Sequence, residues 1–237
     1  MKFFLLLLCL ACAGYGLKAQ HFFPNKQSVV KDSTGRIYTF DEWKILMIQG
    51  SSFRALNPSD PNTEFQISLL SAEQKAERMK KMPRPKETSN FTTGDHISNF
   101  RTKDIQGNTI NLKDLKGKIV VINFWFIHCE PCRAEIPDLN AMVDSFRTND
   151  SVVFIGIALD ERPELKSFLK GNPFNYRIVS DGRPIATQYS IGSYPTHLVL
   201  DQEGKVYFHT SGLALNTVYW LNRSIAELLG KGQTAGQ

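Results

Sequence analysis

The sequence predicts an α/β protein, with a three-layer domain whose central mixed sheet is flanked by helices and a small αβ region before it. Apolar, β-branched runs such as 119–124 and 152–157 read as strands buried on both faces. They alternate with stretches whose apolar residues recur at helical spacing, and a hairpin pattern with a last amphipathic stretch closes the chain.

Length, composition and charge set the limits of this prediction. The 237 residues suit one domain with a smaller partner, and a hydrophobic content of 42% is ample for a core. The formal charge is +5, but no basic cluster stands out, so a nucleic-acid partner is not expected.

Residues 1–19 resemble a secretory signal, with Lys2 before an apolar run that is short for a bilayer-spanning helix. The alternative is a lipoprotein signal cleaved before Cys12. Both interpretations predict export to the periplasm or another extracytoplasmic compartment. Cleavage after Ala19 would leave Cys129 and Cys132 as the only cysteines. This pattern suits thiol–disulfide exchange better than a structural disulfide.

Residues 20–88 are expected to form an accessory region of unknown role. Its predicted elements are a hairpin around Gly35, a helix capped by Asp41, a strand over 65–69, and a helix from a Ser71/Gln74 capping box to about Met82. Pro83 and Pro85 mark a linker.

Residues 89–237 carry the α/β pattern. Strands are predicted at 119–124, 151–159, 176–179, 196–200 and 206–209. Helices are predicted at 131–148 with Pro137 inside, from Pro163, from Pro184 to Tyr189, and after a possible cap at Asn216.

Two cysteines two residues apart, Cys129 and Cys132, stand where the first of these strands meets a helix. The free N–H groups and dipole of a helix start favour a thiolate at Cys129, and a second thiol one turn on can complete a disulfide exchange. A zinc site lacks the further ligands it needs, and an inert disulfide here would close too small a loop to add much stability.

Several motifs carry a family resemblance. They are Leu112-Lys113-Asp114-Leu115-Lys116-Gly117-Lys118, Asn123-Phe124-Trp125, Cys129-Glu130-Pro131-Cys132, Glu135-Ile136-Pro137 and Tyr194-Pro195-Thr196. With them, residues 90–232 resemble the TlpA/ResA-like extracytoplasmic thioredoxin family of thiol–disulfide oxidoreductases. The resemblance implies a thioredoxin fold with Cys129 as the attacking and Cys132 as the resolving thiol.

The resemblance also implies substrate-binding residues. Pro195 is expected to be a cis-proline facing the cysteines, and Tyr194 to offer its backbone to a substrate strand. Trp125 corresponds to a tryptophan that flanks the site, with plain core packing as an equal alternative.

Departures from the family pattern concern proton transfer. Asn123 stands at the position of the thioredoxin aspartate, and Lys103 where a glutamate is expected. Neither is a good proton acceptor, so Asp160, Glu161 or water are the candidates.

Three further residues are expected to tune the site. His128 replaces the usual tryptophan, either as a polar rim residue or as a cation that favours the thiolate, whereas Glu130 opposes the thiolate. Pro131 completes the sequence between the cysteines.

The predicted function is disulfide reduction without a metal or organic cofactor. The resemblance implies a protein disulfide substrate, such as cytochrome c thiols or other exported proteins, and a membrane electron donor. Alternatives are a dithiol oxidase of the same fold and a partner-binding protein that uses the domain as a scaffold. A peroxiredoxin fits less well, because the second cysteine is only one helical turn away.

Overall fold

The computed structural model describes residues 23–234, with side chains as far as residue 230. The predicted signal over residues 1–19 and the alternative anchor Cys12 lie outside the described residues. Within residues 23–234, no helix is both long and apolar enough to cross a membrane.

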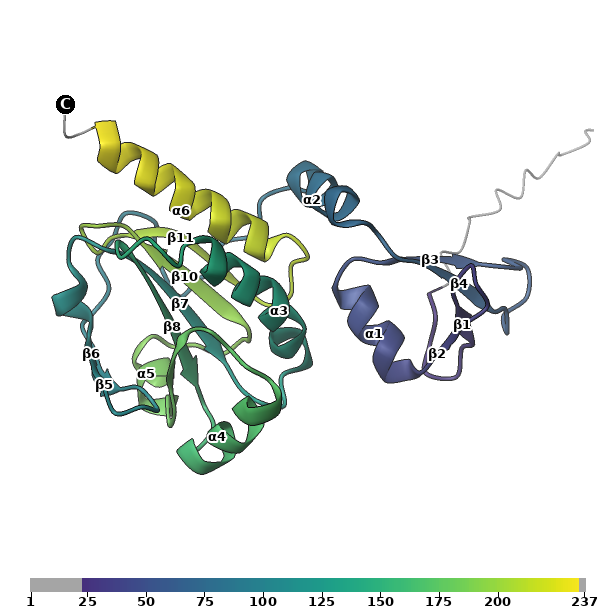
Figure 1. Cartoon of the computed structure of the whole chain (residues 1–237), viewed down its shortest axis with the longest axis horizontal. Coiled ribbons are helices and arrows are strands. Elements are labelled where there is room, and N and C mark those ends of the chain that lie inside the picture. Colours follow the sequence, from purple (N-terminus) through teal and green to yellow (C-terminus); the bar gives the residue numbers. More distant parts are fainter. Residues whose placement is uncertain (1–22, 235–237) are drawn as a thin grey trace, which may run out of the picture.

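A five-stranded mixed sheet forms the centre of the larger domain, in the order β11-β10-β7-β8-β9 (Figure 1). The strands are β7 (Ile119–Trp125), β8 (Val152–Ala158), β9 (Arg177–Val179), β10 (Thr196–Leu200) and β11 (Val206–Ser211). Strands β7, β8 and β9 are parallel, whereas β10 is antiparallel to both β7 and β11. Every residue of β7 is buried, as its apolar run predicted.

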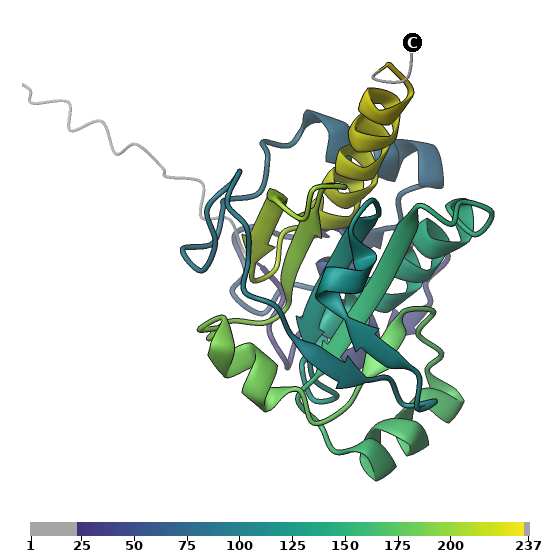
Figure 2. The same ribbon diagram turned by 90° about the vertical axis from the view of Figure 1, so that its left-hand side faces the viewer.

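Helices cover both faces of this sheet. They are α3 (Glu130–Ser145), α4 (Arg162–Gly171), α5 (Arg183–Gln188) and α6 (Thr217–Thr234). Side chains of α3, α4 and α6 pack on one face of the sheet, and those of α5 on the other. The hairpin of β5 (Arg101–Lys103) and β6 (Thr109–Asn111), teal and in front in Figure 2, leads through a 3₁₀ helix (Leu112–Leu115) into β7. This is the predicted three-layer α/β architecture.

The N-terminal region has its own sheet, in the order β2-β1-β4-β3. Its elements are β1 (Val30–Lys31), β2 (Ile37–Tyr38), α1 (Phe40–Ile48), β3 (Ser52–Ala55), β4 (Phe65–Ser68) and α2 (Ala72–Lys81). The predicted hairpin turns at Gly35, whose φ of 87° suits glycine. Trp43 of α1 covers the sheet and forms a small core with Val30, Phe65 and Ile67.

Capping boxes begin both N-terminal helices. The predicted box at Ser71 and Gln74 is present at α2. At α1 the predicted cap Asp41 is wrong: Thr39 is the N-cap, and its hydroxyl and backbone N–H bond reciprocally with Glu42. Asp41 lies inside the first turn, where its charge still suits the helix dipole.

The chain after α2 runs along β11, and a buried histidine lies beneath it. His209 of β11 is 1% exposed, its Nε2 is 3.3 Å from the Thr93 hydroxyl, and its ring packs edge-on against Phe91. Thr210 donates a hydrogen bond to the backbone carbonyl of Lys86 at 2.9 Å. The linker is therefore held to the sheet over several residues.

His209→Gln is expected to reduce the amount by which the free energy of unfolding falls in mild acid. Burial lowers the pKa of His209 below 6.5, against a smaller opposing effect of Glu87. The imidazole therefore binds a proton more readily in the unfolded chain than in the folded one. Its neutral form stabilises the folded state fully above pH 6.5, and this contribution to stability is lost as the pH falls toward the lowered pKa. Urea unfolding of both proteins between about pH 7.5 and 5 measures this, and parallel pH profiles would contradict it.

Candidate active site

The loop between β7 and α3 brings the two cysteines together. Cys129 is the N-cap of α3, and its Sγ accepts a hydrogen bond from the backbone N–H of Cys132 at 3.3 Å. The two residues form a disulfide with their Cα atoms 5.2 Å apart. Pro131 occupies the first turn, where a missing N–H costs no helical bond. The sulfurs thus lie at the end of the helix where anions are stabilised.

Asp160, two residues after the end of β8, fixes this loop. Its Oδ2 accepts a hydrogen bond from the backbone N–H of Ile127 at 2.8 Å. The backbone N–H of Cys129 donates to the Phe126 carbonyl at 3.1 Å, which closes the turn. The Asp160 carboxylate therefore holds the loop that carries the cysteines.

The Tyr194–Pro195 bond is cis, as expected from the family resemblance. The ring of Tyr194 packs edge-on against Phe126, two residues before the loop's exposed His128, with centroids 5.4 Å apart. Pro195 is buried, and its carbonyl accepts a hydrogen bond from Gly212 at 2.8 Å. The loop before β10 is therefore packed on the loop that carries the cysteines.

Trp125 does not lie at the surface of this site. Its side chain is fully buried, and its ring packs against Phe168 and Phe174 at 6.0 and 5.4 Å. A Cβ at Gly156 would come within 3.3 Å of the Trp125 Nε1, so the indole fills the space beside that glycine. This position agrees with the core-packing alternative for Trp125, and its contact with a substrate stays a prediction.

His128 and Glu130, the two polar residues expected to tune the site, have different partners. His128 is 80% exposed in its side chain, and its nearest carboxylate, that of Glu164, is 3.8 Å away, which fits a polar rim residue. Glu130 forms an ion pair with Lys44 of α1. The charge of Glu130 is thus opposed by a cation from the N-terminal region, a partner 86 positions away in the sequence that no local pattern reveals.

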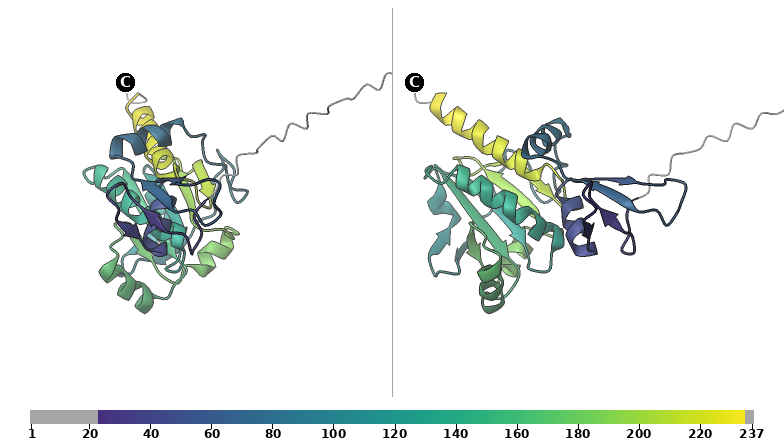
Figure 3. Two further views of the ribbon diagram at one scale, coloured as in Figure 1. Left: turned by 90° about the vertical axis from the view of Figure 1, so that its right-hand side faces the viewer. Right: turned by 45° about the vertical axis from the view of Figure 1, so that its right-hand side comes forward.

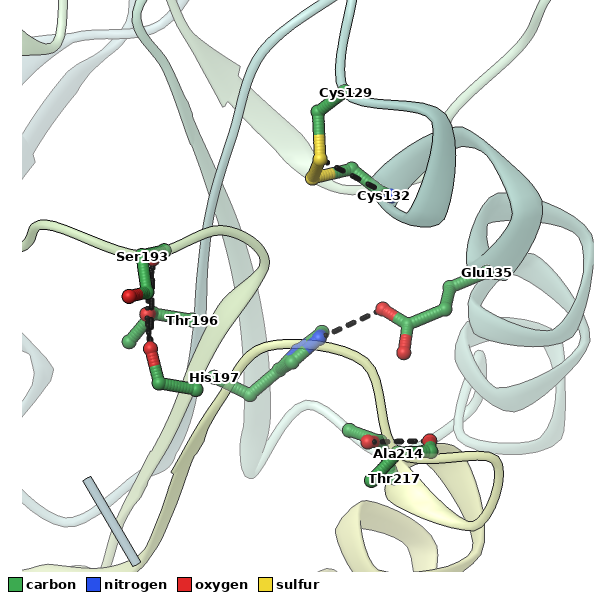
Figure 4. Close-up of polar contacts among 9 residues, drawn as sticks. Cys129, Cys132, Glu135, Ser193, Thr196, His197, Ala214 and Thr217 are labelled. Carbon is green, nitrogen blue, oxygen red and sulfur yellow. Dashed lines mark hydrogen bonds and ion pairs between the residues drawn. A yellow bond between two sulfur atoms is a disulfide. The ribbon is translucent and has the colours of Figure 1, made fainter. Parts of the chain in front are cut away.

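A buried polar cluster lies beneath the disulfide (Figure 4). Glu135 comes one turn after Cys132 on α3 and points toward His197 of β10, with Oε2 2.9 Å from Nε2. Both side chains are buried, and His197 lies opposite Asn123 of β7 in the strand register. Burial and the Glu135 carboxylate raise the pKa of the Tyr176 phenol well above its usual value.

Glu135 is a buried carboxylate on the same helix as Cys132. Lys103, which stands where the family resemblance implies a glutamate, lies exposed on β5. Glu135 belongs to the Glu135-Ile136-Pro137 motif, and its spacing of three residues from Cys132 places both on one helix face. Asn123 is buried with neither side-chain atom hydrogen-bonded to the protein.

Comparisons with known proteins agree with this geometry. Residues 93–209 match the model of the AhpC/TSA family. Thiol-disulfide oxidoreductase ResA of Bacillus cereus is 36% identical over 115 residues, which are 48% of this chain and 66% of that protein, just under two thirds. ResA of Bacillus thuringiensis subsp. konkukian is 33% identical over 121 residues, 50% of this chain and 69% of that protein.

A solved structure supports the fold. The crystal structure of a thiol:disulfide interchange protein of the thioredoxin family from Chlorobium tepidum covers 58% of this chain and 98% of its own, with a TM-score of 0.51 at 23% identity. At that identity the likeness concerns the fold alone. With the identity and coverage of the Bacillus sequences, the chain belongs to the ResA-like family of thiol-disulfide oxidoreductases.

Proposed function

We propose that this protein is an exported thiol–disulfide oxidoreductase that works as a disulfide reductase. The Cys129–Cys132 disulfide at the start of α3 is the observation that carries the proposal, and the cis Tyr194–Pro195 bond, in a loop that packs on Phe126, supports it. The start of a helix favours the thiolate that attacks, and a second sulfur is within bonding distance.

The reaction passes through a mixed disulfide. The Cys129 thiolate attacks one sulfur of the substrate disulfide, and the other sulfur leaves as a thiolate that takes a proton from water. The Cys132 thiolate then attacks the Cys129 Sγ, which releases the second substrate sulfur and leaves the Cys129–Cys132 disulfide. Two electrons pass from the enzyme dithiol to the substrate.

The proposal assigns proton transfer at Cys132 to Glu135. Before Cys132 attacks, its thiol must lose a proton, and Glu135 is the buried carboxylate one turn away on the same helix. The imidazole of His197, 2.9 Å from Glu135, holds that carboxylate under the disulfide. General acid–base assistance of this kind contributes roughly 10²- to 10⁴-fold to a rate.

The same proposal covers the export of the protein, its domain organisation, its substrates and its electron donor. Residues 1–19 would direct export, residues 20–88 form an accessory region, and residues 89–237 form the catalytic domain. Exported proteins with disulfides, cytochrome c thiols among them, are the proposed substrates. Because extracytoplasmic compartments are oxidising, a membrane protein must return the electrons.

A redox titration of Cys129/Cys132 against glutathione tests the proposal, together with reduction of insulin disulfides. A reductase is expected to have a potential below about −240 mV and to accelerate insulin reduction by dithiothreitol. A potential near about −120 mV would establish a dithiol oxidase instead. A chain that exchanges with neither glutathione nor insulin would overturn both assignments.

A further inference from the structure

A groove beside the redox centre joins the N-terminal region to the catalytic domain. It lies between α1 on one side and α3 and α4 on the other, with a volume of about 700 Å³. Its larger apolar lining residues are Ile45, Ile48, Ile136, Pro137, Phe168 and Pro173. The groove reaches Glu130, the residue directly after Cys129.

One ion pair joins the two walls of the groove, and further contacts attach the N-terminal region to the catalytic domain nearby. Lys44 of α1 pairs with Glu130 at the start of α3. Lys75 of α2 pairs with Asp138 of α3 at 2.6 Å, and Asn216, just before α6, donates to the Pro83 carbonyl at 2.9 Å. Figure 3 shows α1 lying against the end of α3 in the right-hand view. The N-terminal region is thus fixed next to the cysteines.

The chemistry of the lining selects the kind of occupant. The side chain of Ile45 is 46% exposed although it faces the groove, and an apolar partner would remove it from water. The charged lining residues are Asp41, Lys44, Glu130 and Arg133, two of each sign, so the groove attracts neither acidic nor basic ligands as such. Apolar side chains of an extended polypeptide meet these conditions, whereas glutathione, small and polar, does not.

We propose that this groove binds the apolar segment of a substrate protein next to its disulfide cysteine. The inference rests on the proposed reductase function and adds a specificity element to it. A groove of this volume accommodates a few side chains. Binding them would hold the substrate sulfur at Cys129, and the N-terminal region would select polypeptide disulfides over small ones.

Substrate preference in the full chain tests this inference. The ratio of kcat/KM for a peptide disulfide with flanking leucines to that for glutathione disulfide is measured for each variant. Ile45→Asp is expected to lower this ratio about 10-fold or more, in the range seen when apolar pocket contacts are lost. Ile45→Ser, which adds no charge, should lower it in the same direction.

Ile37→Asp is the matched control. Ile37 is 65% exposed on β2, outside the groove lining, so the same change there should leave the ratio unaltered. A ratio equal to that of the wild type in both Ile45 variants would overturn the groove while leaving the reductase function intact. A wild-type chain that reduces neither disulfide would overturn the proposed function, and this inference with it.

Discussion

Cys129→Ser is expected to abolish disulfide reduction, whereas Cys132→Ser is expected to stop the reaction half-way. Without the Cys129 sulfur no mixed disulfide forms, and the rate should fall at least about 10³-fold, as when a covalent nucleophile is removed. In Cys132→Ser the Cys129 thiolate still attacks, but no second thiolate is present to release the substrate. The covalent complex should therefore accumulate.

Non-reducing electrophoresis with a peptide disulfide distinguishes the two variants. Cys132→Ser should yield a peptide adduct that dithiothreitol removes, and mass spectrometry should place it on Cys129. Cys129→Ser should yield no adduct under the same conditions. An adduct on Cys132 in the Cys129→Ser variant would reverse the assigned roles, and full activity of that variant would favour a scaffold over an enzyme.

The fold of the catalytic domain can be predicted from the sequence because the patterns that indicate its helices and strands are local. The run 119–124 is apolar throughout, and in the structure β7 is buried on both faces. Pro163 and Pro184 each stand in the first turn of a helix, where proline is tolerated. The Cys129-to-Cys132 spacing required only the strand-to-helix junction to bring the sulfurs together.

Features that depend on contacts between residues far apart in the sequence cannot be predicted from such local patterns. Strands β1 and β4 pair in parallel over two residues each, which leaves too short a pattern to predict. The attachment of the N-terminal region to α3 depends on Lys44–Glu130 and Lys75–Asp138, pairs far apart in the sequence. Any exposed lysine of this region could form such an ion pair, so the sequence alone does not predict the groove.

Two more features of the structure leave a signal in the sequence. Thr39 and Glu42 have the same capping-box spacing as Ser71 and Gln74, which favours Thr39 over Asp41 as the N-cap of α1. His197 stands in the apolar run 196–200, where a polar residue must find a buried partner. Glu135, on the same helix as Cys132, is that partner.

His197→Leu is expected to destabilise the protein by about 3–5 kcal/mol. The change leaves the buried Glu135 carboxylate without the imidazole 2.9 Å away, and an uncompensated buried charge is costly. Chemical unfolding of the oxidised protein measures the loss. His96→Leu is the matched control, because His96 is exposed and the same change there should cost far less.

The double variant Glu135→Leu/His197→Leu separates the stabilising role of the pair from its role in proton transfer. With both polar groups gone, no charge is buried, and most of the lost stability should return. Resolution of the mixed disulfide should nevertheless stay roughly 10²-fold slow, because no carboxylate accepts the Cys132 proton. Rapid-quench measurement of peptide release determines that rate. Recovery of both stability and rate would show that Glu135 serves the fold alone, and that the Cys132 proton leaves through water.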